Sequence, residues 1–301
     1  IKSVNLAPLY NVFGDYNVGY TFFENELTEK SLKNVGQYDL ILAGSTWCKN
    51  KLDEKGIQPS DVLLQGIDPE LFYPETDKQA NNNLFTIFSG GKFEYRKGQD
   101  LVLKAVKILQ QKYKDIVLVN AWYNYWPDVI QTMFFSKHIN FEMFGTSWEQ
   151  FMSRLYEINN LDSSRIITLP LIPNNKLREL YLKTDVALFP NRCEGGTNLV
   201  MMEYMACGRP VIASYNSGHV DVLTEQNSLQ LKNLKEVKLY SDKGVLNADW
   251  SEPELDEIIS TIEYAYYHRE ELKQIGRKAG EDMTGYTWAK TAENLLKFLR
   301  K

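Results

Sequence analysis

Cysteine and histidine are scarce in this sequence of 301 residues, which contains three of each. The cysteines, Cys48, Cys193 and Cys207, lie far apart, and their spacing matches neither a zinc site nor a disulfide framework. We therefore expect no structural metal. Free thiols are typical of proteins in a reducing compartment, so we expect a cytoplasmic location.

Positive charge is not in excess either. The 34 Lys and Arg residues are outnumbered by 39 Asp and Glu residues, which gives a net charge of −5. The basic residues are dispersed, so the sequence lacks the electrostatic footprint of a nucleic-acid-binding protein. No nucleic-acid partner is expected.

Long apolar runs are absent as well. No run approaches the ~18 residues of a membrane span, and no secretory signal opens the chain. We expect no membrane span, although peripheral contact with a membrane stays open. The chain starts at Ile1 rather than Met, which indicates a fragment of a longer sequence.

What the sequence does contain is an alternation of short apolar runs with helical patterns. Hydrophobic residues make up 44% of the chain, which is enough for two packed cores. The alternation predicts an α/β fold with parallel sheets. We expect strands at 38–44, 61–65, 84–90, 115–122, 165–170, 185–190 and 210–214, and helices at 45–51, 99–112, 174–184, from 198, at 251–274 and from 288.

Local signals set several of these boundaries. Ser45 is a candidate N-cap, and Ser251 and Glu254 have the spacing of a capping box. Gly208 suits the left-handed residue that follows a helix end. A polar stretch punctuated by Gly and Pro predicts a domain linker at 74–83.

The stretch NRCEGGTNLVMMEYMACGRPVIAS, at 191–214, reads as a turn, a helix and a strand that follow a buried strand. Ligands bind outside the carboxyl ends of such strands, where helix amino termini present free N–H groups. Gly195, Gly196, Thr197 and Asn198 lie at that point, directly before Leu199. A phosphate or another anionic oxygen would fit there, and a simple tight turn is the alternative.

Two acids flank this turn. Glu203 is set among methionines and a tyrosine on the expected helix, so its carboxylate needs a partner if the helix packs inward. A carboxylate can accept hydrogen bonds from two neighbouring hydroxyls, such as a ribose diol. The alternative for Glu203 is a solvated surface position. Glu194 precedes the turn on its other side.

Here the residues carry a family resemblance. EGGTNLVMMEYMACGRPVIAS resembles the acid–glycine–acid signature of the retaining, nucleotide-sugar-dependent glycosyltransferases of the GT-B fold, family four, also called glycosyl transferase group 1. The resemblance implies that Glu203 holds the ribose and Glu194 a hydroxyl of the donor sugar. The family usually spaces these acids eight apart, whereas Glu194 and Glu203 are nine apart, so the turn carries one additional residue.

A second stretch, FSGGKFEYRKGQDLVLKA, resembles the first strand of the family's donor domain. A basic residue follows the glycine turn at Gly91, and a lysine precedes the next glycine; these are Lys92 and Lys97. The resemblance implies that both lysines, with the turn amides, stabilise the departing diphosphate. The family usually has Arg where Lys92 stands, so a bidentate clamp is replaced by a point charge. Without the resemblance, two lysines in a turn are typical of solvated surface.

The resemblance extends over nearly the whole chain. It implies two Rossmann-like doubly wound domains, of which the amino-terminal one is incomplete. Residues 1–78 resemble the second half of that acceptor-side domain, completed by a return helix at 286–301, and residues 79–285 resemble the nucleotide-sugar-binding domain.

Four further positions complete the candidate site. Base contacts of this fold are expected from the backbone near Leu171 and Pro173. Glu24 is the candidate to replace a histidine that the family often has near the reacting carbon. His219 is a candidate cleft residue, although a lone histidine is more often structural. The aromatic-rich segment 121–151 could stack on a sugar or base, but an insertion packing on its own domain is the alternative we favour.

These features lead to a hypothesis of sugar transfer, with retention, from a UDP- or GDP-type sugar to a glycan or lipid-linked acceptor by a hexosyltransferase. No Asp-x-Asp motif, by which glycosyltransferases of the other common fold bind a metal, is present, so we expect neither a metal nor a cofactor. A binding module without turnover is the alternative from another class. A nucleotide-sugar epimerase, or a phosphorylase carrying a lysine for pyridoxal phosphate, is the alternative among enzymes.

Overall fold

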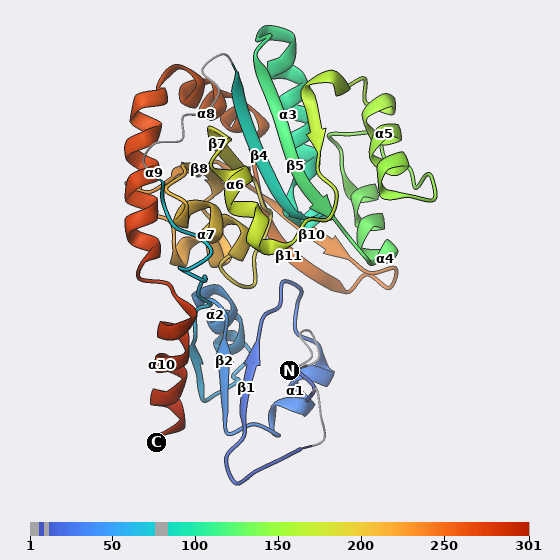
Figure 1. The fold of residues 1–301 in the computed structure, drawn as a ribbon. Coiled ribbons are helices and arrows are strands. Elements are labelled where there is room, and N and C mark those ends of the chain that lie inside the picture. Colours follow the sequence, from blue (N-terminus) through green and yellow to red (C-terminus); the bar gives the residue numbers. More distant parts are fainter. Residues whose placement is uncertain (1–5, 9–11, 76–83, 301) are drawn as a thin grey trace.

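The computed structural model describes residues 6–8, 12–75 and 84–300, which form a large α/β body and a smaller one below it (Figure 1). The smaller body contains the first three strands and also the last helix. Segments from opposite ends of the sequence therefore lie in the same body (Figure 1). The linker expected at 74–83 falls mostly on residues 76–83, outside the described residues.

The large body is built on a six-stranded parallel sheet with the order β6-β5-β4-β7-β8-β9. Its strands are β4 (Phe85–Lys92), β5 (Ile116–Tyr123), β6 (Ile166–Thr168), β7 (Val186–Phe189), β8 (Val211–Ser214) and β9 (Leu229–Leu231). The strand order reverses between β4 and β7, so the crevice at their carboxyl ends is the expected ligand position of a doubly wound sheet.

Helices cover both faces of this sheet because successive strand residues point to opposite sides. Ile116 and Leu118 of β5 pack into one core, and Val117 and Val119 into the other. The first core is covered mainly by α3, α5 and α8, and the second by α6, α7 and α9. The helices are α3 (Gln99–Lys112), α4 (Pro127–Ile130), α5 (Trp148–Ile158), α6 (Leu177–Tyr181), α7 (Leu199–Ala206), α8 (Leu255–Tyr267) and α9 (Arg269–Met283).

The smaller body is a three-stranded parallel sheet with the order β1-β2-β3. Its elements are β1 (Val18–Thr21), α1 (Glu29–Val35), β2 (Leu40–Ala43), α2 (Thr46–Glu54), β3 (Ser60–Val62) and α10 (Trp288–Leu299). Leu295 and Phe298 of α10 pack on the cluster formed by Leu40, Leu42 and Leu63. A helix from the far end of the chain therefore covers this sheet.

Most of the expected elements are present. The helix predicted at 99–112 has the bounds of α3, and Ser45 caps α2 by accepting a hydrogen bond from the Cys48 N–H at 3.1 Å. Gly208 follows α7 with a φ of +73°, as the left-handed position requires. The strand expected at 61–65 is shorter and shifted, because only Ser60–Val62 pairs with β2.

The helix expected at 251–274 is wrong at its start and in its middle. Ser251 lies in β11 (Leu246–Pro253), where it pairs with Glu236 of the antiparallel strand β10 (Leu234–Tyr240), so it cannot cap a helix. The helical segment then breaks at His268, which separates α8 from α9. Strand pairing with a distant segment overrode the local capping signal.

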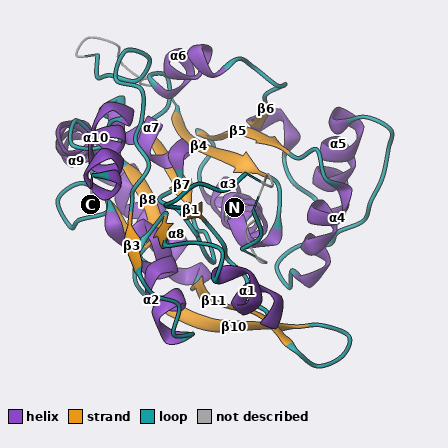
Figure 2. Ribbon diagram, turned by 90° about the horizontal axis from the view of Figure 1, so that it is seen from below, coloured by secondary structure: helices purple, strands orange, loops and turns teal. Residues whose placement is uncertain are grey.

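The β10–β11 hairpin reaches from the large body to the smaller one. The indole Nε1–H of Trp250 donates to the Glu24 carbonyl at 2.6 Å, and the Glu26 N–H donates to the Asn247 carbonyl at 2.7 Å. Figure 2 shows β10 and β11 running alongside each other. The hairpin therefore fixes the 24–26 segment against the large body.

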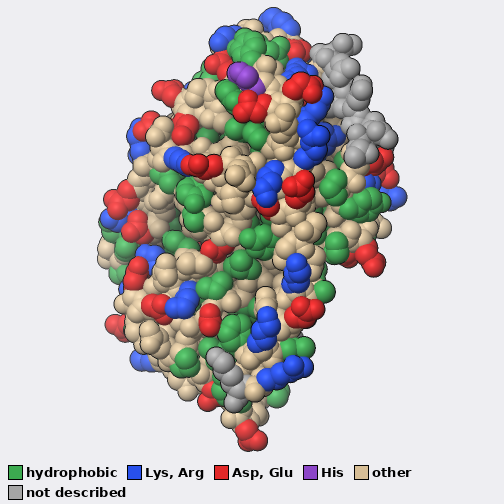
Figure 3. Space-filling model, turned by 90° about the vertical axis from the view of Figure 1, so that its left-hand side faces the viewer, with side chains coloured by type: hydrophobic (Ala, Val, Ile, Leu, Met, Phe, Trp, Pro, Cys, Tyr) green, Lys and Arg blue, Asp and Glu red, His purple; other side chains and the backbone are tan. Residues whose placement is uncertain are grey.

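The surface carries mixed charge. Lys or Arg and Asp or Glu side chains are interspersed on the face shown in Figure 3. No helix in the described part of the chain has the length and apolar character needed to cross a membrane.

A buried arginine ties together three parts of the large body. The guanidinium of Arg192 is fully buried, and it donates to both carboxylate oxygens of Asp100 on α3, at 2.9 and 2.8 Å, and to Glu252 of β11 at 2.7 Å. It also lies 3.6 Å above the ring of Tyr95. Because Arg192 lies in the loop after β7, this cluster holds that loop against α3 and the hairpin.

We expect Arg192→Met to lower the free energy of unfolding by about 3–5 kcal/mol, because it leaves Asp100 buried without its cation. Urea unfolding at neutral pH measures the loss. Arg154→Met is the control: its exposed pairs with Glu142 and Glu157 should contribute almost nothing. An equal loss of unfolding free energy in both variants would contradict the stabilising role assigned to Arg192.

Candidate functional site

The loop 190–198 connects β7 to α7, and all nine of its residues are buried. Its centre is held from the smaller body: the Gly195 carbonyl accepts from the Ser45 hydroxyl at 2.8 Å, and the Gly195 N–H donates to Oε1 of Glu24 at 3.3 Å. A Cβ atom at Gly195 would lie 2.5 Å from the Phe23 carbonyl oxygen, so only glycine allows this approach. The two bodies meet at the glycine turn.

Glu194 is the charged centre of this loop. Its carboxylate accepts hydrogen bonds from the ammonium of Lys97 and the amide of Asn191, and its second oxygen lies 3.2 Å from Nη1 of Arg96. Burial opposes the negative charge, but the attraction of Lys97 and Arg96 outweighs it and lowers the pKa of Glu194 to about 2. Glu194 is therefore an anion at any physiological pH.

Arg96 belongs to the same cluster, and sequence reasoning missed it. It lies in the 3₁₀ turn Tyr95–Lys97 between β4 and α3. Its guanidinium donates to the Cys193 carbonyl at 2.8 Å and to Glu94 at 2.6 Å. Its position next to Lys97 in the sequence was the signal that could have found it, since a one-turn element can direct two neighbouring side chains to one site.

The remaining turn residues have internal partners. The Thr197 hydroxyl donates to the sulfur of Met202 at 2.9 Å. Asn198 is the N-cap of α7 and accepts from the Met201 N–H at 3.4 Å, with a φ of +64°. Leu199 is the first residue of α7, one residue after the expected start at 198. Gly196 lies against the smaller body, because a Cβ atom there would be 3.1 Å from the Phe22 ring.

His219 supports Asn198 and does not line an open cleft. It is fully buried, its Nδ1 lies 3.0 Å from the Ser214 carbonyl oxygen, and its Nε2 lies 3.1 Å from the Asn198 amide nitrogen. Burial lowers the pKa of His219 to about 4 despite the nearby charge of Glu194. A neutral ring with Nδ1 protonated and Nε2 accepting from Asn198 satisfies both contacts.

Lys92 lies apart from Lys97. It is exposed at the end of β4, and its ammonium stands 4.7 Å from the centre of the Trp126 ring. Lys92 and Gly91 line a cavity of about 320 Å³ whose other walls include Trp126, Leu171 and Val200. Part of the aromatic segment 121–151 therefore faces a cavity, while Trp122, Met133 and Phe151 of the same segment are core residues.

Gly91 separates this cavity from the charged cluster. Its φ is +117°, and the Cε atom of Lys97 lies 3.9 Å from the position that a Cβ atom would take there. An apolar cavity and a cluster of charged side chains therefore border the same glycine, at the carboxyl end of β4.

Glu203 lies on α7 and is partly buried. Its Oε1 accepts from the amide of Asn174 at 3.2 Å. Burial raises the pKa of Glu203 to about 7, since this hydrogen bond offsets only part of the desolvation. Asn174 follows Pro173, which with Leu171 is exposed. The Asn174 contact therefore places Glu203 against the 171–174 loop.

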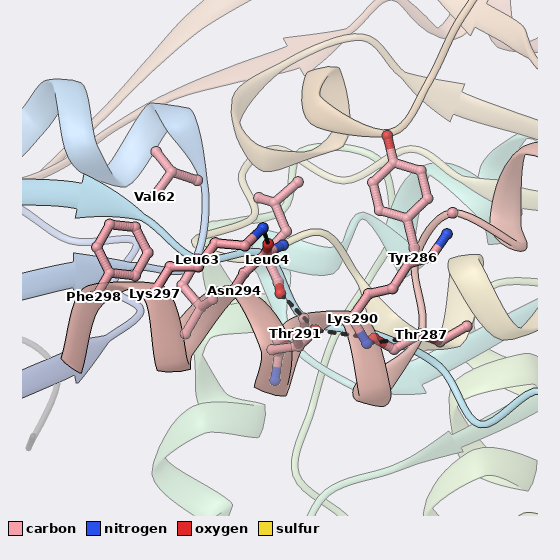
Figure 4. A pocket seen from close by; sticks show the side chains of 12 residues that line it. Val62, Leu63, Leu64, Tyr286, Thr287, Lys290, Thr291, Asn294, Lys297 and Phe298 are labelled. Atoms are coloured by element: carbon pink, nitrogen blue, oxygen red, sulfur yellow. Dashed lines mark hydrogen bonds between the residues drawn. The ribbon is translucent and has the colours of Figure 1, made fainter. Parts of the chain in front are cut away.

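A second cavity, of about 490 Å³, lies between α10 and residues 62–65 (Figure 4). In the wall of this cavity, the Thr291 hydroxyl of α10 donates a hydrogen bond to the Leu64 carbonyl at 3.0 Å. Within the described ranges, no three or more His, Cys, Asp or Glu side chains are grouped as a metal site.

Comparison with known proteins finds a matching family model and two proteins of similar sequence. The model of the family described as glycosyl transferases group 1 matches residues 75–234. Spore coat protein SA of Bacillus subtilis is 22% identical over 247 residues, which are 80% of this chain and 58% of that protein. An uncharacterized glycosyltransferase of Methanocaldococcus jannaschii is 28% identical over 187 residues, 62% of this chain and 43% of that protein. The chain thus spans about half the length of these relatives.

Solved structures agree on the fold. A sucrose-phosphate synthase from Thermosynechococcus elongatus has a TM-score of 0.67 at 18% identity, covering 90% of this chain and 60% of the synthase. HepE of Anabaena, in complex with UDP and glucose, has a TM-score of 0.66 at 15% identity, covering 94% of this chain and 71% of HepE. The expected GT-B fold is confirmed, and this chain covers only part of each neighbour.

The raised pKa of Glu203 predicts a specific pH dependence of stability. The folded state holds this proton up to about pH 7, whereas an unperturbed carboxyl titrates at 4.5, so the wild type loses stability relative to Glu203→Gln as pH rises from 5 to 8. Urea unfolding of both proteins at several pH values measures the difference. The exposed Glu179 on the neighbouring helix α6 is the control, and Glu179→Gln should follow the wild type. A constant difference between wild type and Glu203→Gln would refute the shift.

Proposed function

The chain belongs to the glycosyl transferases group 1 family, and we propose that it transfers a sugar, with retention at the anomeric carbon, from a nucleotide diphosphate donor to a sugar, glycan or lipid-linked acceptor. The observation that carries the proposal is the pair of environments around Gly91. One side holds an apolar cavity with an aromatic wall, and the other holds Lys97 and Glu194. A nucleotide diphosphate has the same division between its base and its charged end.

The two acids would act on different parts of the donor. Glu194 stays charged and would accept from a hydroxyl of the transferred sugar, while its charge favours a positive anomeric centre. Glu203 would accept from the ribose hydroxyls across from the 171–174 loop. Lys97 would stabilise the departing diphosphate.

Of the UDP- and GDP-type donors, the UDP type is the first to test, because the HepE structures contain UDP and UDP-glucose. Transfer would need neither a metal nor a cofactor under this proposal. Retained activity in the presence of a chelator is the expected result.

A binding module without turnover is the second candidate function. It is favoured by the length of the match, since this chain spans 58% and 43% of the two relatives. The acceptor side of the cleft would then be supplied by residues outside these 301.

Transfer and binding are separated by testing this chain and the full-length gene product side by side. Each is incubated with UDP- and GDP-sugars and cell extract, and labelled product is measured together with the thermal shift on nucleotide binding. Transfer by either protein supports the glycosyltransferase. Binding without transfer by both supports the module, and the absence of binding by both refutes the proposal.

We expect Lys97→Ala to weaken binding of uridine diphosphate by roughly 10-fold or more while uridine binding changes little, because only the diphosphate meets the ammonium. Isothermal titration calorimetry with each ligand measures the two affinities separately. Lys104→Ala removes the same charge from a residue that lines a different cavity and should leave both affinities unchanged. An equal loss for nucleoside and diphosphate would exclude the role of Lys97.

Glu194→Gln should lower the rate of sugar transfer by at least about tenfold without weakening uridine diphosphate binding, because its proposed partner is the sugar. Single-turnover transfer and equilibrium titration measure the two effects separately. Transfer at the wild-type rate would remove Glu194 from the mechanism.

A further inference from the structure

The glycine turn already holds an anion, supplied by the chain itself. Oε1 of Glu24 accepts from the Gly195 N–H at 3.3 Å and lies 3.5 Å from Nη1 of Arg96. Carboxylate and phosphate oxygens both accept charge-assisted hydrogen bonds from N–H and guanidinium groups. The contact therefore identifies a place where these groups accept a negative oxygen.

From this contact we propose that Arg96 is a phosphate-contacting residue of the donor site, and that the Glu24 carboxylate occupies the phosphate position until the donor displaces it. The inference rests on the proposed function, since it takes the ligand to be a nucleoside diphosphate. It adds a cation that sequence reasoning did not assign, and an internal competitor for it.

Arg96 is better placed for this contact than Lys92. Arg96 lies 3.2 Å from Glu194, beside Lys97, and its side chain is 13% exposed. Lys92 projects instead onto the ring of Trp126. A guanidinium also presents several N–H donors in a fixed plane, which suits the oxygens of a phosphate.

The charges of the cluster explain why Glu24 must leave. Three carboxylates, Glu24, Glu94 and Glu194, surround the two cations Arg96 and Lys97. An incoming phosphate thus meets a surplus of negative charge while Glu24 is in place. With Glu24 displaced, two cations balance two carboxylates, and the repulsion falls.

Glu24 can leave without movement of the backbone. Its side chain is 29% exposed, so rotation can carry the carboxylate into water. Its carbonyl stays bonded to the indole of Trp250 at 2.6 Å. The bonds that join the two bodies at this segment are therefore separate from the carboxylate contact.

The test compares uridine diphosphate with uridine in titrations of the wild type, Glu24→Gln and Glu26→Gln. We expect Glu24→Gln to bind the diphosphate about three- to tenfold more tightly, with uridine affinity unchanged, because a competing charge is lost. Glu26 lies two residues away and faces Lys51 and Lys55, at 3.7 Å each, so Glu26→Gln should match the wild type.

Arg96 is tested by the same comparison of uridine diphosphate affinity with uridine affinity. Arg96→Met should weaken diphosphate binding roughly 10- to 100-fold, spare uridine binding, and abolish the gain from Glu24→Gln in the double variant. If Arg96→Met does not fold, Arg96→Lys keeps the charge but loses the planar donors, and its diphosphate affinity should still fall by about three- to tenfold.

Three results would overturn the inference. Diphosphate affinity that is unchanged or weaker in Glu24→Gln shows that Glu24 is no competitor. An Arg96 variant that folds and binds the diphosphate like the wild type, or that loses uridine equally, removes Arg96 from the phosphate site. Failure of the wild type and Glu24→Gln alike to bind either ligand overturns the proposed function itself.

Discussion

The burial of Arg192 is the constraint on which the candidate site depends. A guanidinium without access to water must keep its anions, and Asp100 and Glu252 come from elements that are distant in the sequence. The Arg192 N–H also donates to the Arg96 carbonyl at 2.7 Å. The loop that carries Glu194 is therefore fixed to the turn that carries Arg96 and Lys97, and the charged cluster follows from that attachment.

The environment gives the two acids of the candidate site opposite properties. Both are desolvated, which by itself raises the pKa of a carboxyl. Glu194 faces two cations and ionises easily, whereas Glu203 has neutral partners such as the amide of Asn174 and keeps its proton to about pH 7. One chemical group thus serves as a permanent anion at one position and as a titrating group at the other.

Close contact between the bodies is the second constraint. Residues 22–24 pack directly on Gly195 and Gly196 because no Cβ atom keeps these two segments apart. The Trp250 indole also donates to the Glu24 carbonyl. Under the proposed function, a donor that reaches Glu194 would meet the Glu24 carboxylate, which accepts from the Gly195 N–H. The smaller body therefore contributes the 22–24 segment to the surroundings of the candidate site.

The sequence by itself determined the α/β class, the bounds of α3, the N-cap of α2, the left-handed glycine after α7 and the placement of the 195–198 turn beyond the end of a strand, because these depend on local periodicity, capping and strand ends. It could not place Ser251, His219 or Arg96. Ser251 joined a strand through pairing with Glu236, and His219 became a buried support of Asn198. Only the tertiary structure decided these, because each depends on partners that are remote in the sequence and on the loss of water around them.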